Sequence, residues 1–574
     1  MKYLFLSPYG AIDDWKFSEF QLQKILSSNN EIYLIGCQNI LKKSCIAIKA
    51  HSNFYKNDYL KNKICKRCIK NQKDYGKKYK IFYLENYITK EDQLLVNSEL
   101  LKINANNFVE YKFANYEIGK IALFETMLIF KKNKLEFTKN EFQIIKDTIF
   151  DTILFYLALK KIYKDIEPDI GIFQNGSYSL SKLFNNFLID MKKKSYAWDC
   201  SLNYHDNFSK LFIKKNDNNY GINYIKNNWS LKLKDRPITK DNIKNVNKHF
   251  KSLINAKTLR NFSKRYNHSD KDLKDIYNIS EKKIILLCTS SWDEVIATYI
   301  YKGVNLDTLL IFKDQNEWLN KCIEFFKSKK DCRLIIRPHP RDFDNKNSDI
   351  SNFLKNTNTL PNNVTLNLPN HKVSLYTILK DVDLVLNAWS TLGMEAGILN
   401  IPTISISKEL LVYPAEIENF QRNEKDYFIK INSILDLNNK QFDLELCKNF
   451  YNFSTSFMED NAINLHRKRN NILYFLFKAI NKITFFLSIK TYFKDFQGFN
   501  NDIKTTNLKL NKFFNSNLNI LNEMDKTSNK IDHVTDKDYI NGFLELSKVL
   551  INKKDNTILY KKTINLDGKV ISGK

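Results

Sequence analysis

Two arginines enclose a histidine between two prolines in the segment Arg337-Pro-His-Pro-Arg341, which directly follows the apolar run 334–336. The prolines stiffen the backbone and remove N–H donors, so His339 is held between the guanidinium groups of Arg337 and Arg341. Guanidinium forks, with an imidazole as hydrogen-bond donor or acid, suit a phosphate group. The alternative is a surface turn that contains a histidine by chance.

A second segment of this kind is Asn387-Ala-Trp-Ser-Thr-Leu-Gly-Met-Glu395, again after an apolar run. Ser390 and Thr391 are expected to begin a helix, where their hydroxyls and the free amides of the first turn would bind an anion. Glu395 lies one turn further on and would accept the hydroxyls of a nucleotide ribose. The alternatives are a plain helix cap at Ser390 and an exposed first-turn Glu395.

The third segment, Cys288-Thr-Ser-Ser-Trp-Asp-Glu294, also combines a strand end, a hydroxyl-rich turn and a helix start with acidic residues. By itself it predicts only a good helix cap. Together the three segments predict a pocket for the phosphates of a nucleotide, to which Ser290 and Glu294 would also contribute.

Short apolar runs separated by helical patterns are the elements that must position these segments. In the second half of the chain they lie at 283–288, 333–337, 364–366, 383–387 and 402–406. In the first half they lie at 2–6, 31–36, 170–174 and 194–198. Apolar strands of about five residues between helices are typical of parallel sheets covered on both faces, whose ligands bind at the carboxyl ends of the strands.

The fold class expected is therefore α/β, with two Rossmann-like parallel-sheet domains that face a cleft and a helical, basic C-terminal extension. Residues 205–275 are polar, without a sustained apolar period, and predict an interdomain connection. The expected division is residues 1–250 for the N-terminal α/β domain, 276–440 for the nucleotide-binding α/β domain, 441–500 for C-terminal helices and 501–574 for a polar tail, in part disordered.

The composition excludes global disorder and fibrous classes and favours anionic partners. The chain has 574 residues, 90 Lys+Arg against 63 Asp+Glu, and a formal net charge of +27. The apolar N-terminal run is too short for a secretory signal peptide, so we expect a cytoplasmic protein. Nine cysteines then indicate reduced thiols or metal ligands.

The Arg337-Pro-His-Pro segment and the stretch Asp383–Thr403 resemble the C-terminal half of GT-B fold glycosyltransferases, most closely bacterial capsule and surface polysaccharide proteins that include Kdo transferases and polysialyltransferases. The loop at Asn175-Gly176 is similar to the N-terminal Asn-Gly loop of such proteins. The resemblance covers residues 1–410. It departs from the pattern at Ser177, where a basic residue is usual, and at Asn400, where glycine is common but asparagine tolerates a left-handed backbone.

The resemblance implies roles for the residues singled out above. It makes His339, Ser390 and Thr391 contacts of the donor phosphates and Glu395 a ribose ligand. Arg337, Arg341, Ser290, Glu294 and Asn175 are the other substrate-binding candidates.

The function expected is transfer of a sugar from a nucleotide donor to a surface polysaccharide or lipid-linked glycan, by an inverting enzyme without a catalytic metal. Such an enzyme needs a base for the acceptor hydroxyl. Asp13, Asp14, Asp199 and His205 are candidates, and Asp199 is preferred because it follows the strand 194–198. A polyol-phosphate transferase on the same fold is one alternative. The other is a non-catalytic nucleic-acid or membrane-surface binding protein, and no RNA-binding module supports the nucleic-acid form.

Two features lie outside this scheme. Cys37, Cys45, Cys65 and Cys68 could form a structural zinc site, separate reduced thiols or a redox pair. Residues 472–496 carry apolar residues at helical spacing together with four lysines. This stretch predicts either a helix on an anionic membrane surface or a helix packed on the core.

Overall fold

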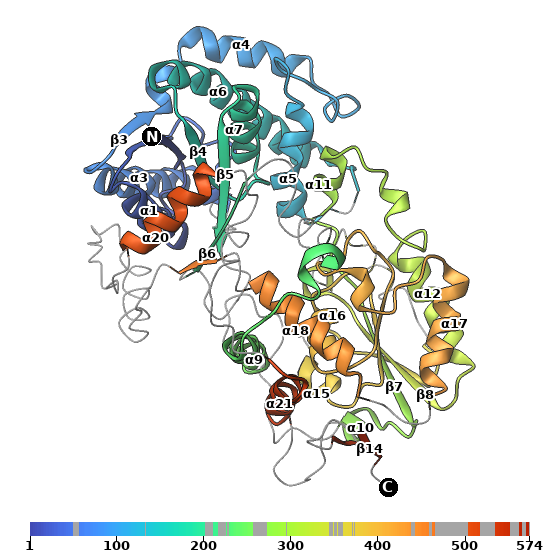
Figure 1. Ribbon diagram of the computed structural model, residues 1–574. Coiled ribbons are helices and arrows are strands. Elements are labelled where there is room, and N and C mark those ends of the chain that lie inside the picture. The colour runs from blue at the N-terminus through green and yellow to red at the C-terminus, as the bar shows by residue number, and fades with distance from the viewer. Residues whose placement is uncertain are drawn as a thin grey trace.

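The computed structural model places the chain in two lobes, each built around its own β-sheet (Figure 1). The first lobe holds a seven-stranded sheet and the second a five-stranded sheet. The structure describes residues 1–49, 57–132, 134–200, 210–215, 226, 229–256, 273–293, 295–343, 348, 350, 353, 360–369, 371, 373–437, 442–458, 462–464, 503–516, 534–550, 562–564 and 570–572.

The first sheet is parallel except at one edge. Its strands are β1 (Lys2–Leu6), β2 (Glu31–Gly36), β3 (Lys80–Tyr83), β4 (Ile170–Gln174), β5 (Lys194–Cys200), β6 (Lys210–Lys215) and β12 (Ala462–Asn464), in the order β12-β6-β5-β4-β1-β2-β3. The pairings of β6 with β5 and of β12 with β6 are antiparallel, which the sequence did not predict. Strand order reverses between β1 and β4, and such a reversal opens a crevice at the carboxyl ends of the two strands.

Alternate residues of β1 face opposite layers of helices. Tyr3 and Phe5 pack in one core cluster with residues of α1, whereas Leu4 and Leu6 pack in another with residues of α5, α6 and α7. Helix α6 starts with a capping box in which Thr138 and Glu141 exchange hydrogen bonds with each other's backbone. The helices of this lobe are α1 (Asp13–Leu26), α2 (Ile46–Lys49), α3 (Asp58–Gly76), α4 (Lys90–Leu101), α5 (Ile118–Phe130), α6 (Lys139–Ile166) and α7 (Ser179–Asp190).

The second sheet is parallel throughout. Its strands are β7 (Lys283–Cys288), β8 (Cys332–Arg337), β9 (Val364–Leu366), β10 (Leu384–Asn387) and β11 (Thr403–Ser405), in the order β11-β10-β7-β8-β9. Leu286, Leu334 and Val385 are fully buried, as expected for strands covered on both faces. Its helices are α10 (Leu273–Tyr277), α11 (Ile296–Tyr301), α12 (Gln315–Lys327), α13 (Pro340–Phe343), α15 (Leu375–Leu379), α16 (Leu392–Ile398), α17 (Glu424–Leu435) and α18 (Leu444–Met458).

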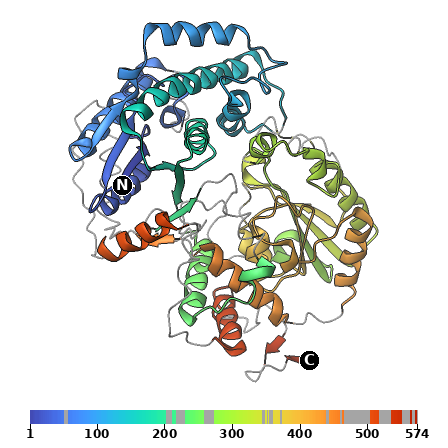
Figure 2. The same ribbon diagram turned by 45° about the horizontal axis from the view of Figure 1, so that its top comes forward.

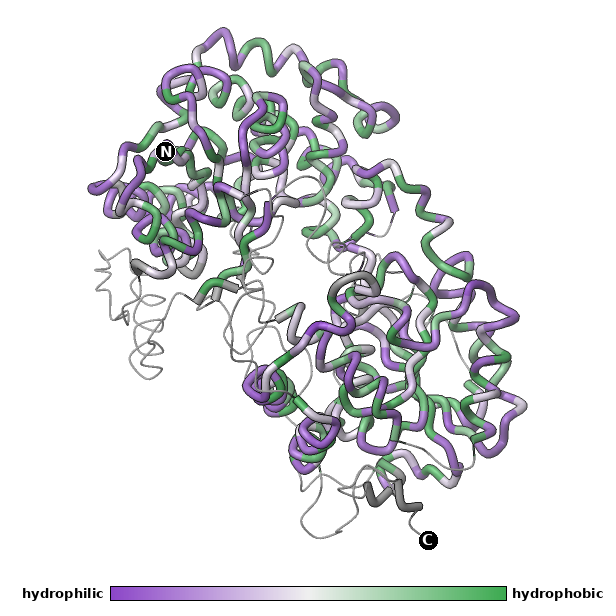
Figure 3. Tube along the Cα trace, in the orientation of Figure 1, coloured by the Kyte–Doolittle hydropathy of each residue, from purple (hydrophilic) through white to green (hydrophobic). Residues whose placement is uncertain are grey.

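The hydropathy of the chain follows this layering. Figure 3 shows that hydrophobic segments gather inside each lobe, while the outer helices alternate between hydrophobic and hydrophilic residues. The two sheets and the helices that cover them confirm the expected fold class, two Rossmann-like α/β domains. Asn400 has φ = +59°, so the left-handed backbone expected in place of glycine is present.

The segment expected to be an interdomain connection contains a helix of the second lobe. Helix α9 (Lys240–Ile254) contributes Ile243, Val246 and Phe250 to the core of that lobe. It lies beside α18 and beside α21 (Asp536–Ser547), as Figures 1 and 2 show. The boundary expected at residue 250 therefore cuts through a packed helix. The apolar residues at 243, 246, 250 and 253 recur at helical spacing, and this pattern could have predicted the helix.

The chain after residue 441 is shared between the two lobes. Strand β12 joins the first sheet, and α20 (Ile503–Asn515) packs on the same sheet through Leu510, Phe513 and Phe514. Part of the expected polar tail is thus packed helix, while β13 (Lys562–Ile564) and β14 (Val570–Ser572) form a separate pair. The stretch 472–496 lies outside the described residues. Within the described ranges, no helix combines the length and apolar character needed to cross a membrane.

Helix α20 offers a test of this packing. Phe514 is fully buried, with its ring centroid 4.4 Å from that of Tyr196 on β5, whereas Leu508 on the same helix is 68% exposed. Phe514→Ala should lower the free energy of unfolding by about 3 kcal/mol, because a buried aromatic side chain leaves a cavity. Urea denaturation measures the loss, and Leu508→Ala is the matched control. Equal stability of the two variants would contradict the docking of α20.

Candidate functional site

A cleft of about 740 Å³ lies between the lobes and is lined by residues of both. From the first lobe come residues 175–178, which follow β4, and residues 197–199 at the end of β5. From the second lobe come residues 288–291, 337–341 and 389–392, the three segments that the sequence singled out. The cleft has the size of a ligand site and lies at the carboxyl ends of the parallel strands.

The loop after β8 is tied to the end of β7. The backbone N–H of His339 donates to Thr289 Oγ1 at 2.9 Å, and the backbone N–H of Arg341 donates to His339 Nδ1 at 3.3 Å. Burial lowers the pKa of His339 to about 4, and the positive charges of Arg341 and Lys131 add to this effect. His339 is therefore neutral at pH 7, with Nδ1 as an acceptor and the proton on Nε2. In this state His339 suits the role of a hydrogen-bond donor better than that of a general acid.

The two arginines beside His339 have different surroundings. Arg341 pairs with Asp293 at 2.7 Å, and the Asp293 side chain is 1% exposed, so a buried carboxylate compensates this guanidinium. Arg337 is 7% exposed and donates from Nη1 to Asn367 Oδ1, a neutral partner. Arg337 therefore keeps its positive charge in the cleft wall beside a neutral hydrogen-bond partner, and Glu395 acts on it electrostatically.

Glu395 is held by a tyrosine and is not the exposed first-turn residue of the alternative interpretation. The hydroxyl of Tyr376 donates to Glu395 Oε2 at 2.8 Å. Burial raises the pKa of Glu395 to about 7, although Tyr376 and Arg337 both favour the charged form. Glu395 can thus change its charge near neutral pH, in reach of the cleft.

The start of α16 differs from the anion site that the sequence predicts. Ser390 Oγ accepts the backbone N–H of Leu392 at 3.3 Å, and Ser390 O accepts that of Gly393 at 3.2 Å. These first-turn amides are therefore already bonded, as in the plain-cap alternative. Ser390 and Thr391 still line the cleft, so their side chains rather than free amides are what the helix start offers.

Ser290 connects the loop after β7 to the loop after β10 and to helix α12. Its Oγ accepts the backbone N–H of Trp389 at 3.2 Å, and its backbone exchanges two hydrogen bonds of 2.8 Å with the side chain of Gln315. Ser290 is 3% exposed, so it acts first as a positioning residue. Glu294 lies outside the described residues.

The acceptor-side candidates meet on the opposite wall. Asn175, at φ = +42°, donates from Nδ2 to Asp199 Oδ2 at 3.2 Å, and its backbone N–H donates to Trp198 O. Both Asn175 and Asp199 line the cleft. His205 and the side chains of Asp13 and Asp14 lie outside the described part of the structure.

Several residues of the site were not found from the sequence. Tyr376, Asn367 and Thr289 hold Glu395, Arg337 and the His339 loop, respectively. Thr289 belongs to a segment that the sequence did single out, and its hydroxyl next to the strand end was the available signal. Asn367 follows β9 in the same way that the other site residues follow their strands. No neighbouring sequence pattern predicts a role for Tyr376 in the site.

Three of the four N-terminal cysteines are buried and Cys45 is partly buried. Burial raises the pKa of all four thiols, to about 11 for Cys45 and about 12 for Cys68. Cys68 Sγ donates to Pro8 O, and Cys37 Sγ accepts the Leu41 N–H. Among the described residues no group of three or more His, Cys, Asp or Glu side chains has the arrangement of a metal site. This arrangement favours the alternative of separate reduced thiols, and the structural zinc site stays a prediction.

No protein-family model matches the sequence, and the comparison with curated proteins found no match. Solved structures with a likeness include a Methanocaldococcus jannaschii UDP-GlcNAc 2-epimerase in complex with UDP-GlcNAc and UDP (14% identity, 79% of this chain and 98% of that chain, TM-score 0.29). Others are S. aureus MnaA with UDP (10%, 86% and 98%, 0.27) and Thermosulfurimonas dismutans KpsC, a β Kdo 2,4 transferase (12%, 46% and 78%, 0.28). At these identities and TM-scores they assign no activity to this chain.

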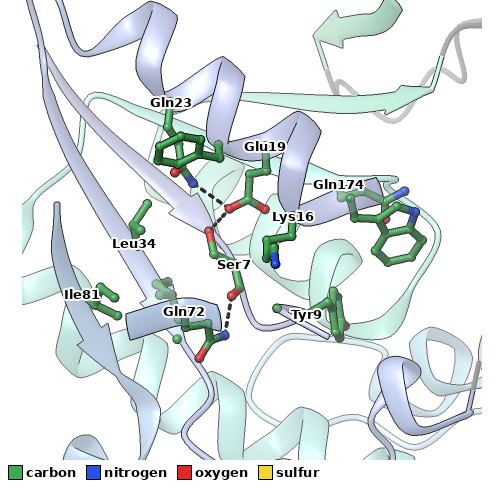
Figure 4. Close-up of a pocket in the computed structure, with 14 residues that line it drawn as sticks. Ser7, Tyr9, Lys16, Glu19, Gln23, Leu34, Gln72, Ile81 and Gln174 are labelled. Carbon is green, nitrogen blue, oxygen red and sulfur yellow. Dashed lines mark hydrogen bonds between the residues drawn. The ribbon is translucent and has the colours of Figure 1, made fainter. Parts of the chain in front are cut away.

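A smaller cavity, lined mostly by apolar groups but with several polar side chains, lies at the carboxyl end of β1, next to the point where the strand order reverses (Figure 4). Glu19 Oε1 accepts from the Ser7 hydroxyl and from Gln23 Nε2, and Gln72 Nε2 donates to Ser7 O. Burial raises the pKa of Glu19 to about 8. Glu19 was not predicted as a buried residue, although it lies three and seven positions before the buried Leu22 and Leu26, on the apolar stripe of α1.

Glu19 predicts a pH dependence of stability. The folded pKa is about 8 against an ordinary value of 4.5, so the folded state holds an extra proton between these values and loses stability as the pH rises through them. Glu19→Gln cannot titrate and keeps an acceptor oxygen. Relative to the wild type, it should gain stability between pH 5 and pH 8, by up to about 1.4 kcal/mol per pH unit. Urea denaturation at several pH values measures this, with the exposed Glu136→Gln as control. A pH-independent difference would contradict the assignment.

Proposed function

We propose that the protein is a glycosyltransferase that uses the cleft to move a sugar from a nucleotide donor to an acceptor hydroxyl. The observation that carries this proposal is the donor wall. It combines a buried Arg337 whose hydrogen-bond partner is neutral, a neutral His339 and a tyrosine-held Glu395, and Asp199 lines the same cleft from the other lobe. A cation for phosphates and a carboxyl group for ribose hydroxyls are the groups that a nucleotide sugar requires.

The donor would bind with its phosphates at Arg337 and His339. The guanidinium supplies positive charge in a site of low dielectric constant, where it acts more strongly than in water. His339 supplies an Nε2–H donor, because its Nδ1 is an acceptor of the Arg341 amide. Ser390 and Thr391 add hydroxyl groups, and Glu395 accepts hydrogen bonds from the ribose.

The chemical step would be a single displacement with inversion at the anomeric carbon. The acceptor oxygen forms the new bond to this carbon, the bond from carbon to the phosphate oxygen breaks, and the nucleotide leaves with the electron pair. Asp199 accepts the proton of the acceptor hydroxyl, and Asn175 orients its carboxylate. Arg337 and His339 stabilise the charge on the leaving phosphate, a task that a metal ion performs in other transferases.

The acceptor class rests on the resemblance of the motifs at 337–340 and 383–403 to capsule and surface polysaccharide proteins. It supports a surface glycan or a lipid-linked glycan as acceptor. No described residue favours the polyol-phosphate alternative over sugar transfer.

A screen of nucleotide sugars and nucleotide-activated polyols, read by release of free nucleotide, tests the proposal directly. Mass spectrometry of the product distinguishes a transferred sugar from a transferred polyol phosphate. Nucleotides should also raise the melting temperature at low concentration. Stabilisation only by oligonucleotides, sensitive to salt, would instead support a nucleic-acid binding protein.

His339→Ala should reduce turnover about 100-fold, because a donor to a leaving phosphate acts mainly in the transition state. His339→Gln keeps an N–H donor and should recover part of the rate. Because the pKa of His339 is about 4, wild type and His339→Gln should have parallel pH–rate profiles between pH 6 and 8. Steady-state kinetics on folded variants measure these effects, and normal turnover in His339→Ala would remove the residue from the site.

Glu395→Gln should weaken nucleotide binding by about 1–3 kcal/mol, the range for a hydrogen bond to a charged group. With a pKa of about 7, Glu395 is mostly a carboxylate above pH 7, so wild-type affinity should rise from pH 6 to pH 8 more than that of the variant. Isothermal titration calorimetry at both pH values measures this. Equal affinity of both proteins at pH 8 would exclude the ribose role.

A further inference from the structure

Four lysines from separate elements line a third concavity, which we call the lysine pocket. Lys120 lies on α5, Lys182 on α7 and Lys214 on β6, whereas Lys302 follows α11, which comes after β7 in the chain and packs on α5 of the first lobe. The concavity has a volume of about 70 Å³, and Tyr301 and Phe124 also line it. Its charged groups therefore come from segments that are far apart in the chain and converge on one space.

The lysines of the pocket differ in their ion pairing. Lys120 pairs with Glu117 at 3.1 Å, and Glu409 attracts Lys302 electrostatically. Lys182 forms no ion pair with a described residue, and its ammonium lies 4.3 Å from the ring centroid of Tyr301. Burial and the charge of Lys302 lower the pKa of Lys182 to about 8. Two ammonium groups that repel each other in a confined space are stabilised by an anion between them.

The lysine pocket is continuous with the cleft wall that holds Asn175 and Asp199. Gly176, Ser177 and Thr298 line both spaces, as do Lys214 and Lys302. Gly176 directly follows Asn175, the residue that orients Asp199. An acceptor whose hydroxyl lies at Asp199 can therefore extend past residues 176 and 177 into the lysine pocket, away from the donor wall.

We propose that the lysine pocket binds an anionic group, a phosphate or a carboxylate, of the acceptor substrate. The acceptor is then acidic, either a phosphorylated glycan carrier or a glycan with acidic sugars. The statement that the anion belongs to an acceptor rests on the proposed function. Binding of an anion to the lysine pocket can be tested without turnover. A volume of about 70 Å³ has room for one such group.

Calorimetric titration with inorganic phosphate, with glucuronate and with neutral glucose tests the site. We expect the anions but not glucose to bind, and Lys182→Gln and Lys302→Gln each to weaken binding at least fivefold. Lys182→Arg keeps the charge and should retain binding. Lys160→Gln, an exposed lysine of α6, is the control. The tighter of the two anions indicates whether the acceptor group is a phosphate or a carboxylate.

The donor wall could also take phosphate, so its contribution is separated with Arg337→Gln. Phosphate binding that survives in Arg337→Gln and is lost in Lys182→Gln lies in the lysine pocket, whether or not the protein transfers sugars. Nucleotide binding should be unchanged in Lys182→Gln. Absence of anion binding in the wild type, or equal binding in folded Lys182→Gln and Lys302→Gln, would overturn the proposal.

Discussion

Two hydroxyl groups at the end of β7 hold the donor wall together. Thr289 accepts the backbone N–H of His339, and Ser290 accepts that of Trp389. Because β7 lies between β8 and β10, these two bonds join the loops on both sides of it. A buried N–H without a partner costs about 1–3 kcal/mol, so a shift of either loop is penalised. This constraint determines where His339 and Ser390 can lie relative to each other.

Burial then sets the charge of each group along this wall. His339 is kept neutral, Glu395 titrates near pH 7, and Arg337 keeps its charge beside the neutral Asn367. Arg341, which the sequence places symmetrically with Arg337 about the histidine, is compensated by the buried Asp293. The wall therefore presents one positive charge, one neutral donor and one switchable carboxyl group, a set that fits phosphates beside a ribose.

Many of the strands and of the residues that line the cleft could be predicted from local sequence patterns. Apolar runs such as 283–288 are too hydrophobic to lie on a surface, so they predict buried parallel strands. Polar residues at the carboxyl ends of such strands must lie at one edge of their sheet, which is why Arg337 and Ser390 line the same wall of the cleft. Asn400 adopts the left-handed backbone because its short side chain allows it. Each of these properties depends on neighbours in the chain.

Only the tertiary structure decided the properties that depend on distant residues. The bond of Tyr376 to Glu395 and the buried Asp293 beside Arg341 join segments that no spacing rule connects. The cysteines near the N-terminus have the spacing of a possible metal site, yet the burial that raises their pKa values comes from the packing around them. Helix α20 reaches the first sheet across more than 300 residues of chain, as in the contact of Tyr196 with Phe514. Burial and protonation are set by everything that surrounds a group, and sequence neighbours are a small part of those surroundings.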